Sequence, residues 1–202
     1  DGSLLTVTSW TGAITGSMGF TYNTDFRITA ETVNGANSVS FTYDNDGFLT
    51  GAGSLTLTRN TQNGFITGST LGSVATSQSY NNFGEMSQLT TTNNGTTLFD
   101  VQYTRDNLGR ITQKTETVNA VTNTYAYSYD TAGRLTDVAL NSVNVRHYTY
   151  DSNSNRISLN TVTATYDNQD RLLTYGNNSY IYSANGELQR KTSPAGMTSY
   201  QY

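Results

Sequence analysis

The side chains that could do chemistry in this chain are few and lie far apart. His147 is its single histidine, and there is no cysteine. A histidine that acts as a general base needs a nucleophile held beside it, yet every serine falls in a repeated segment or in a connection between repeats. We therefore expect His147 to be an exposed or cross-strand residue, and we predict no catalytic residue and no enzyme activity.

The carboxylates also favour a structural role. Asp44-Asn45-Asp46-Gly47 resembles the opening of a calcium-binding loop, but residues 49–53 supply no acidic side chain for the later ligand. A turn closed by the Asp44 side chain explains this segment better. Asp130, Asp151 and Asp167 could serve glycoside hydrolysis only as pairs across a cleft, whereas equivalent positions in a repeat explain them without chemistry. We predict no metal and no cofactor.

These acids belong to a phrase that recurs along the chain, and its clearest copy is residues 127–136, YSYDTAGRLT. Tyr127 and Tyr129 are two residues apart, so on a strand both rings point to one face. The next four residues have the composition of a turn, in which the Asp130 carboxylate accepts backbone N–H bonds and Gly133 takes a positive φ. From Arg134 on, the side chains again alternate as on a strand that returns antiparallel to the first. The phrase therefore predicts a β-hairpin.

Copies of this phrase fill the chain from residue 8 to residue 202. Successive copies are about 19 residues apart, which is the length of one hairpin and its connection. We therefore predict that residues 1–202 form a single array with no second domain. The residues that define the repeats are Tyr43, Asp44, Gly47, Tyr103, Gly109, Arg110, Tyr127, Tyr129, Asp130, Gly133, Arg134, Tyr150, Asp151, Tyr166, Asp167, Arg171, Tyr182 and Gly186.

The phrase Y-x-Y-D-x-x-G-R-(L/I)-T, its spacing and the Thr- and Asn-rich filler resemble the YD repeats of the Rhs family. These repeats also occur in Tc-type insecticidal toxins, bacterial wall-associated proteins and teneurins. The resemblance implies an all-β fold in which tandem hairpins join into one curved, spiralling antiparallel sheet. It further implies a shell that encloses a toxic segment or serves as an extracellular scaffold. We expect the chain to be a fragment or processed piece of such a protein.

Several copies depart from the phrase. Asparagine replaces the aspartate at Asn23, Asn60 and Asn81, and arginine takes the second aromatic position at Arg59 and Arg105. We interpret these changes as drift in a structural repeat. The arginines beside the turn glycines are expected to pair with turn carboxylates and to stack on neighbouring tyrosine rings.

Composition and charge exclude several classes of function. The net charge is -4 and the two lysines, Lys114 and Lys191, form no basic stripe, so nucleic acid is not an expected partner. No apolar run is long enough to cross a membrane, so we expect no membrane insertion. Only 35% of the residues are hydrophobic while fifteen are tyrosine, which favours a sheet covered by rings and threonine methyls over a thick aliphatic core.

Three functions remain open. The first is a non-enzymatic shell or scaffold outside the cell, whose partners are adjacent repeats or a cargo of the same polypeptide. The second is polysaccharide binding by rings and amides, with Trp10 as the one indole. The third is self-association, in which residues 4–8 pair with residues 200–202 of another copy through open sheet edges.

Overall fold

The computed structural model describes residues 4–202, and every regular element in that range is a β-strand. The strands are β1 (Val7–Trp10), β2 (Gly16–Tyr22), β3 (Ile28–Val33), β4 (Ala36–Tyr43), β5 (Leu49–Ala52), β6 (Leu55–Arg59), β7 (Ile66–Leu71), β8 (Val74–Tyr80), β9 (Met86–Asn93), β10 (Thr96–Arg105), β11 (Ile111–Val118), β12 (Val121–Tyr129), β13 (Leu135–Leu140), β14 (Val143–Tyr150), β15 (Arg156–Leu159), β16 (Val162–Tyr166), β17 (Leu172–Tyr175), β18 (Asn178–Tyr182), β19 (Leu188–Ser193) and β20 (Gly196–Ser199). The described residues include no helix that could span a membrane.

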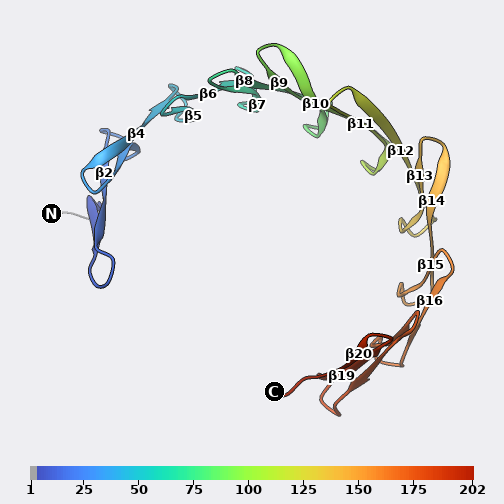
Figure 1. The fold of residues 1–202 in the computed structure, drawn as a ribbon. Helices are drawn as coiled ribbons and strands as arrows, with labels where there is room; N and C mark the ends of the chain where they lie inside the picture. Colours follow the sequence, from blue (N-terminus) through green and yellow to red (C-terminus); the bar gives the residue numbers. More distant parts are fainter. Residues whose placement is uncertain (1–3) are drawn as a thin grey trace. The chain divides into compact units, whose positions relative to one another are not determined.

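The chain divides into two compact units. The first contains residues up to Gln102 together with Glu116–Thr122, and the second contains Tyr103–Thr115 and Asn123–Tyr202. In the first unit the strands pair antiparallel in chain order from β1 to β10. In the second they do so from β12 to β20. Successive hairpins lie side by side within each unit (Figure 1), so the predicted all-β array of antiparallel hairpins is confirmed.

Two kinds of turn alternate, because consecutive connections of an antiparallel meander lie at opposite ends of the strands. At one end are the turns of the recurring phrase, which we call motif turns. The other end carries mostly two-residue turns with residues at positive φ, such as Asn94-Gly95 and Asn141-Ser142. The motif turns of the described chain are residues 23–27, 44–48, 60–65, 81–85, 106–110, 130–134, 151–155, 167–171 and 183–187.

Strand pairing shifts by one residue at the motif turns. Ser128 pairs with Asp137, but the next residue, Tyr129, pairs with Leu135, so Thr136 is left over. The same shift occurs just before the other motif turns whose registers are known, for example at Tyr150. A bulge of this kind increases the local twist and re-aims a side chain. Here the shift falls at the last residue before the motif turn, for example Tyr129 or Tyr150.

The sheet has very little core. Val101 and Ala164 are the buried apolar residues of the described chain, at 3% and 6% exposed, and no side chain there is below 2% exposed. Along the end of β12 the tyrosines are half-buried, whereas Ala126 and Ser128 between them are exposed. Because strand side chains alternate between faces, the rings gather on one face of the sheet.

Hydroxyl groups occupy the other face near the motif turns. Pairs of side-chain oxygens lie within hydrogen-bond distance across the hairpins, at 3.0 Å for Thr42 and Thr50 and at 2.9 Å for Ser79 and Ser87. Rings on one face and paired hydroxyls on the other therefore cover the sheet in place of an aliphatic core.

Candidate functional site at the junctions between hairpins

The motif turns are closed by the aspartate that the sequence singles out. The Asp130 N–H donates to the carbonyl of Arg134 at 2.9 Å, and the Gly133 N–H donates to the carbonyl of Asp130 at 3.0 Å. The Asp130 Oδ1 atom accepts the Arg134 N–H at 2.9 Å. Gly133 has φ of 83°, a conformation that favours glycine. The predicted turn with its side-chain acceptor is therefore observed.

An arginine four residues after the aspartate completes the turn. The guanidinium Nε lies 2.7 Å from the carboxylate Oδ2 in the pairs Asp106–Arg110, Asp130–Arg134 and Asp167–Arg171. Hydrogen bonds from the backbone and side chain of the arginine hold the pKa of Asp130 and Asp167 below its usual value. Partial burial acts to raise the pKa of Asp106, but the hydrogen bonds from Arg110 outweigh it and that pKa is also lowered.

The second aromatic residue joins each hairpin to the one before it. Tyr150 donates its hydroxyl to the carbonyl of Leu135 at 2.8 Å, and Leu135 is the first residue after the preceding motif turn. The acceptor is a strand carbonyl of the preceding hairpin, so this bond ties together two hairpins that are neighbours in the chain. The tyrosines that make such a bond are Tyr43, Tyr80, Tyr129, Tyr150, Tyr166 and Tyr182. Tyr22 instead donates to the carbonyl of Leu5, which lies just before β1.

The arginine makes a second link across the same junction. The guanidinium carbon of Arg110 lies 4.7 Å from the centre of the Tyr129 ring, and that of Arg134 lies 4.8 Å from the Tyr150 ring. Arg171 lies 5.3 Å from the Tyr182 ring. A cation over an aromatic face is attracted by the ring quadrupole. Each arginine therefore binds its own aspartate and the tyrosine of the next hairpin.

The turn glycine has a second role at the junction. A Cβ atom added to Gly47 would lie 2.0 Å from the Arg27 guanidinium, and one added to Gly84 would lie 3.0 Å from the Phe65 ring. The glycine thus leaves a slot for the side chain that reaches over from the preceding motif turn. Positive φ and close packing both favour glycine at this position.

Two departures from the phrase, at Asn81 and Arg59, keep the usual contacts with other atoms. Asn81 Oδ1 accepts the Glu85 N–H at 3.0 Å as an aspartate would, and Asn81 Nδ2 donates to Glu85 Oε2 at 2.7 Å. The charged pair is thereby replaced by an amide donor and a carboxylate acceptor. Donor and acceptor have exchanged places here, and the hydrogen bond is kept.

Arg59 shows a related exchange. It takes the second aromatic position, and its Nε donates to the carbonyl of Leu49 at 3.2 Å, as a tyrosine hydroxyl does elsewhere. The preceding motif turn carries Phe48 where an arginine is usual, and the Arg59 guanidinium lies 5.1 Å from the Phe48 ring. Cation and ring have therefore changed sides, and the cation–π contact remains. The sequence analysis missed Phe48 and Phe65 as junction residues, although their position just after the turn glycine was a usable signal.

The predicted repeat-defining residues occupy equivalent places in the hairpins. Of these, Asp44, Asp130, Asp151 and Asp167 accept backbone N–H bonds within motif turns. Asp106, which the sequence analysis did not include, does the same. Gly47, Gly109, Gly133 and Gly186 have positive φ in those turns. Tyr103 and Tyr127 are the first aromatic residues of their repeats, and Tyr103 has the Arg105 guanidinium 5.7 Å from its ring. Burial raises the pKa of Tyr127.

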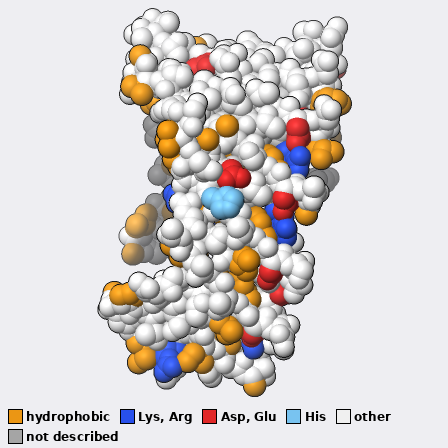
Figure 2. All heavy atoms as spheres, turned by 90° about the vertical axis from the view of Figure 1, so that its right-hand side faces the viewer, with side chains coloured by type: hydrophobic (Ala, Val, Ile, Leu, Met, Phe, Trp, Pro, Cys, Tyr) orange, Lys and Arg blue, Asp and Glu red, His pale blue; other side chains and the backbone are white. Residues whose placement is uncertain are grey.

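The other candidate residues do not assemble into a reaction centre. His147 lies directly across from Asp137, with its Nδ1 atom 2.7 Å from Asp137 Oδ1, on the face shown in Figure 2. The hydrogen bond from His147 lowers the pKa of Asp137. Asp44 Oδ1 accepts the N–H groups of Asp46 and Phe48, which is the turn expected from the sequence. Among the described residues there is no group of three or more histidines and acids that could hold a metal.

Comparison with known proteins agrees with this architecture. The profile of a family described as Teneurin YD-shell matches residues 1–202. The chain belongs to this family. The motif turns are therefore the YD turns of a teneurin-type shell sequence, and the resemblance to YD repeats is confirmed.

Individual relatives match part of the YD-shell chain. Teneurin-3 of Mus musculus is 34% identical over 99 residues, and Teneurin-4 of Homo sapiens is 35% identical over 99 residues. Each match covers 45% of this chain and 4% of the relative, so the chain corresponds to a small part of these proteins.

Solved structures share the fold of the YD-shell chain. A crystal structure of TcdB2-TccC3-Cdc42 matches 90% of the chain with a TM-score of 0.65 and 17% identity, and the match covers 12% of that structure's chain. One of TcdB2-TccC3 matches 90% of the chain with a TM-score of 0.52 and 17% identity, again over 12% of the other chain.

Replacing Tyr150 by phenylalanine should lower the free energy of unfolding by about 1–2 kcal/mol, because the carbonyl of Leu135 loses its donor at a half-buried junction. The measurement is urea denaturation followed by circular dichroism. Tyr148→Phe in the same strand is the matched control, since no hydrogen bond of that hydroxyl is present. Equal effects of the two changes would contradict the role of the Tyr150 bond.

Because the Phe48 ring and the Arg59 guanidinium are in contact, we expect the stability effects of substitutions at these two positions to depend on each other. Phe48→Arg alone should destabilise the chain by placing two guanidinium groups together, and Arg59→Tyr alone should have a smaller effect. The double variant restores the usual order of cation and ring, so it should be more stable than the sum of the two single changes predicts, by about 1 kcal/mol. Strict additivity in a double-mutant cycle of urea unfolding would show that the contact carries no energy.

Stability should fall in acid. The folded-state pKa values of Asp106, Asp130 and Asp167 are lowered, so these carboxylates stabilise the fold above their usual pKa, and this contribution is lost as the pH falls below about 5. Asp130→Asn keeps the Oδ1 acceptor and removes the charge, so the melting temperature of this variant should depend less on pH between neutrality and acid. Asp46→Asn, exposed in a YD turn, serves as the control and should keep the pH dependence of the parent chain.

Proposed function

We propose that this chain is a wall segment of an extracellular shell, a non-enzymatic scaffold that encloses or presents a cargo carried by the same polypeptide. The repeat-defining residues are structural in this proposal. Membership of the Teneurin YD-shell family supports it, as does the fold shared with the TcdB2-TccC3-Cdc42 structure. The whole chain is then one array within a longer repeat protein.

The observation that carries the proposal is the single-layer construction of the sheet. Two buried apolar residues in the described chain cannot hold a globular domain together, so stability comes from links between neighbouring hairpins. Because these contacts reach only from one hairpin to the next, hairpins can be added to the array one at a time, as in other repeat proteins. Such a sheet can be extended and has two broad faces, which are the properties of a wall.

The decisive experiment is isolation of the native polypeptide that contains these residues, followed by its intact mass and limited proteolysis. We expect a mass far above the 22.0 kDa of this chain and a segment that resists protease until the repeat array is unfolded. A native product near 22.0 kDa, or a larger product in which every segment outside the array is cleaved at once, would contradict the shell.

Self-association through sheet edges is the competing function. Within residues 4–202, β1 pairs with β2 and β20 pairs with β19, so the outer backbone groups of both strands have no strand partner in that range. Sedimentation of the 202-residue chain separates the two functions, because an edge-to-edge filament grows with protein concentration and a wall segment stays at the mass of one chain.

A further inference from the structure

Four Asn-Gly pairs lie in turns of this chain, at Asn34-Gly35, Asn63-Gly64, Asn94-Gly95 and Asn185-Gly186. In such a pair the glycine nitrogen can attack the carboxamide carbon of the asparagine, because glycine has no side chain to hinder the approach. The reaction needs a carboxamide that can turn and a glycine N–H that is not used elsewhere. Hydrogen bonds to either group must open first. The structure therefore decides which pair reacts.

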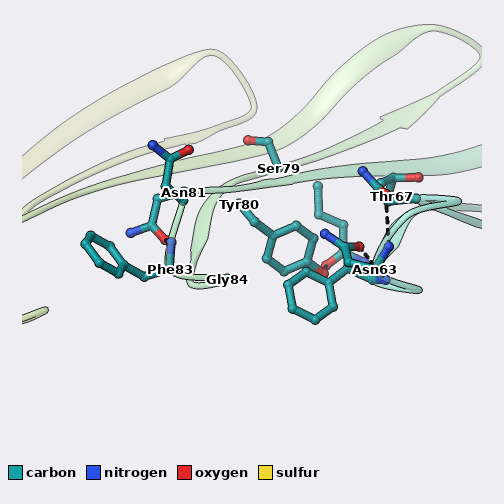
Figure 3. A pocket seen from close by; sticks show the side chains of 11 residues that line it. Asn63, Thr67, Ser79, Tyr80, Asn81, Phe83 and Gly84 are labelled. Carbon is teal, nitrogen blue, oxygen red and sulfur yellow. Dashed lines mark hydrogen bonds between the residues drawn. The ribbon is translucent and has the colours of Figure 1, made fainter.

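The two pairs in YD turns have their glycine N–H in use. Gly64 donates to the carbonyl of Asn60 at 2.8 Å, and Gly186 donates to the carbonyl of Ser183 at 3.0 Å. Asn63, labelled in Figure 3, is also held by its side chain, whose Oδ1 atom accepts a backbone N–H at 3.0 Å. These bonds close the YD turns, so both pairs are protected for as long as the turns are formed.

The other two pairs lie in two-residue turns and differ in one bond. The backbone N–H of Asn34 donates to the carbonyl of Ser17 and that of Asn94 to the carbonyl of Ser73, both at 2.9 Å. Neither of the following glycines donates its N–H to an atom of residues 4–202. Asn34 Oδ1 also accepts the Ser17 N–H at 2.7 Å, whereas the exposed Asn94 carboxamide makes no hydrogen bond within the described chain. Asn94 therefore has both reacting groups free.

The bond that protects Asn34 recurs in other two-residue turns. Asn141 Oδ1 accepts the Thr124 N–H at 2.9 Å, and Asn160 Oδ1 accepts the His147 N–H at 2.7 Å. In both cases the backbone N–H of the asparagine donates to the carbonyl of that same residue at 2.8 Å. A carboxamide held in this way cannot turn toward the next residue of the chain. The free carboxamide in the 94–95 turn is thus a departure from a feature of the fold.

We propose that Asn94-Gly95 is a site of spontaneous deamidation. The Gly95 nitrogen forms a bond to Asn94 Cγ, the bond from Cγ to Nδ2 breaks, and the Gly95 amide proton leaves with the ammonia. Water then adds to either carbonyl of the cyclic imide, which gives aspartate or isoaspartate. Either product adds one negative charge, and isoaspartate also adds a carbon to the backbone of a turn in which Asn94 has φ of 48°. The proposal does not depend on the shell function.

Incubation of the folded 202-residue chain at neutral pH, followed by peptide mapping with mass spectrometry, tests the proposal. We expect Asn94 to react about fivefold faster than Asn34, the ratio that one additional hydrogen bond maintains. Asn63 and Asn185 should also react more slowly than Asn94. In concentrated urea the four pairs should react at similar rates, because the dipeptide is then the same and the turns are absent.

Two variants provide a matched comparison within this chain. Ala120→Gly and Ser142→Gly each create a new Asn-Gly pair in a two-residue turn, and glycine suits the φ of 66° and 69° at these positions. The Asn119 carboxamide makes no hydrogen bond in the part of the chain that the structure describes, whereas Asn141 is held by Thr124. The new pair at Asn119 should therefore react about fivefold faster than the new pair at Asn141.

Asn94→Gln should abolish the fast product, because the longer side chain forms the cyclic imide much more slowly. A fast product that persists in this variant would overturn the proposal. So would a folded chain in which Asn34, Asn63 or Asn185 reacts as fast as Asn94, or equal rates in the two glycine variants. The proposal also fails if Asn94 stays intact over the time in which the chain in urea is converted.

Discussion

The hydrogen bond from a tyrosine hydroxyl to a strand carbonyl of the preceding hairpin is the interaction on which this structure depends. A single-layer sheet cannot bury enough apolar surface to offset the conformational entropy lost on folding. Each junction therefore needs directional contacts, and the tyrosine supplies one at its tip and a ring surface along its length. The arginine guanidinium packs against that ring, and the aspartate of the same turn neutralises the arginine's charge. Three residues of two hairpins thus satisfy one another.

Exchange of side chains at the junctions shows which features are essential. Asparagine can replace aspartate because the backbone N–H groups need an oxygen acceptor and not a charge, as Asn81 demonstrates. Arginine can replace tyrosine at Arg59 because its Nε reaches the same kind of carbonyl, provided that a ring stands opposite. What the exchange at Arg59 keeps is a donor to the carbonyl and a contact of a ring with a cation. Residue identity is secondary to this arrangement.

Much of the repeat could be predicted from sequence, because its turn chemistry is local. Alternation of Tyr127 and Tyr129, the acceptor at Asp130 and the positive φ of Gly133 all depend on residues within one hairpin. The partners of each tyrosine and arginine could not be predicted, because they lie in a neighbouring hairpin whose register is set by a bulge such as that at Tyr129. For the same reason the contacts of Arg59 with Leu49 and Phe48 could not be predicted from its own repeat.

The short range of the junction contacts has a mechanical consequence. Every tyrosine bond and cation–π contact described here joins a hairpin to itself or to the next one along the chain. A pulling force applied at one end would therefore load the terminal junction alone, and the hairpins would peel away one after another. Resistance to such a force is set at each moment by the junction at the loaded end and not by the number of repeats, so lengthening the array enlarges the sheet without strengthening it against tearing from an end.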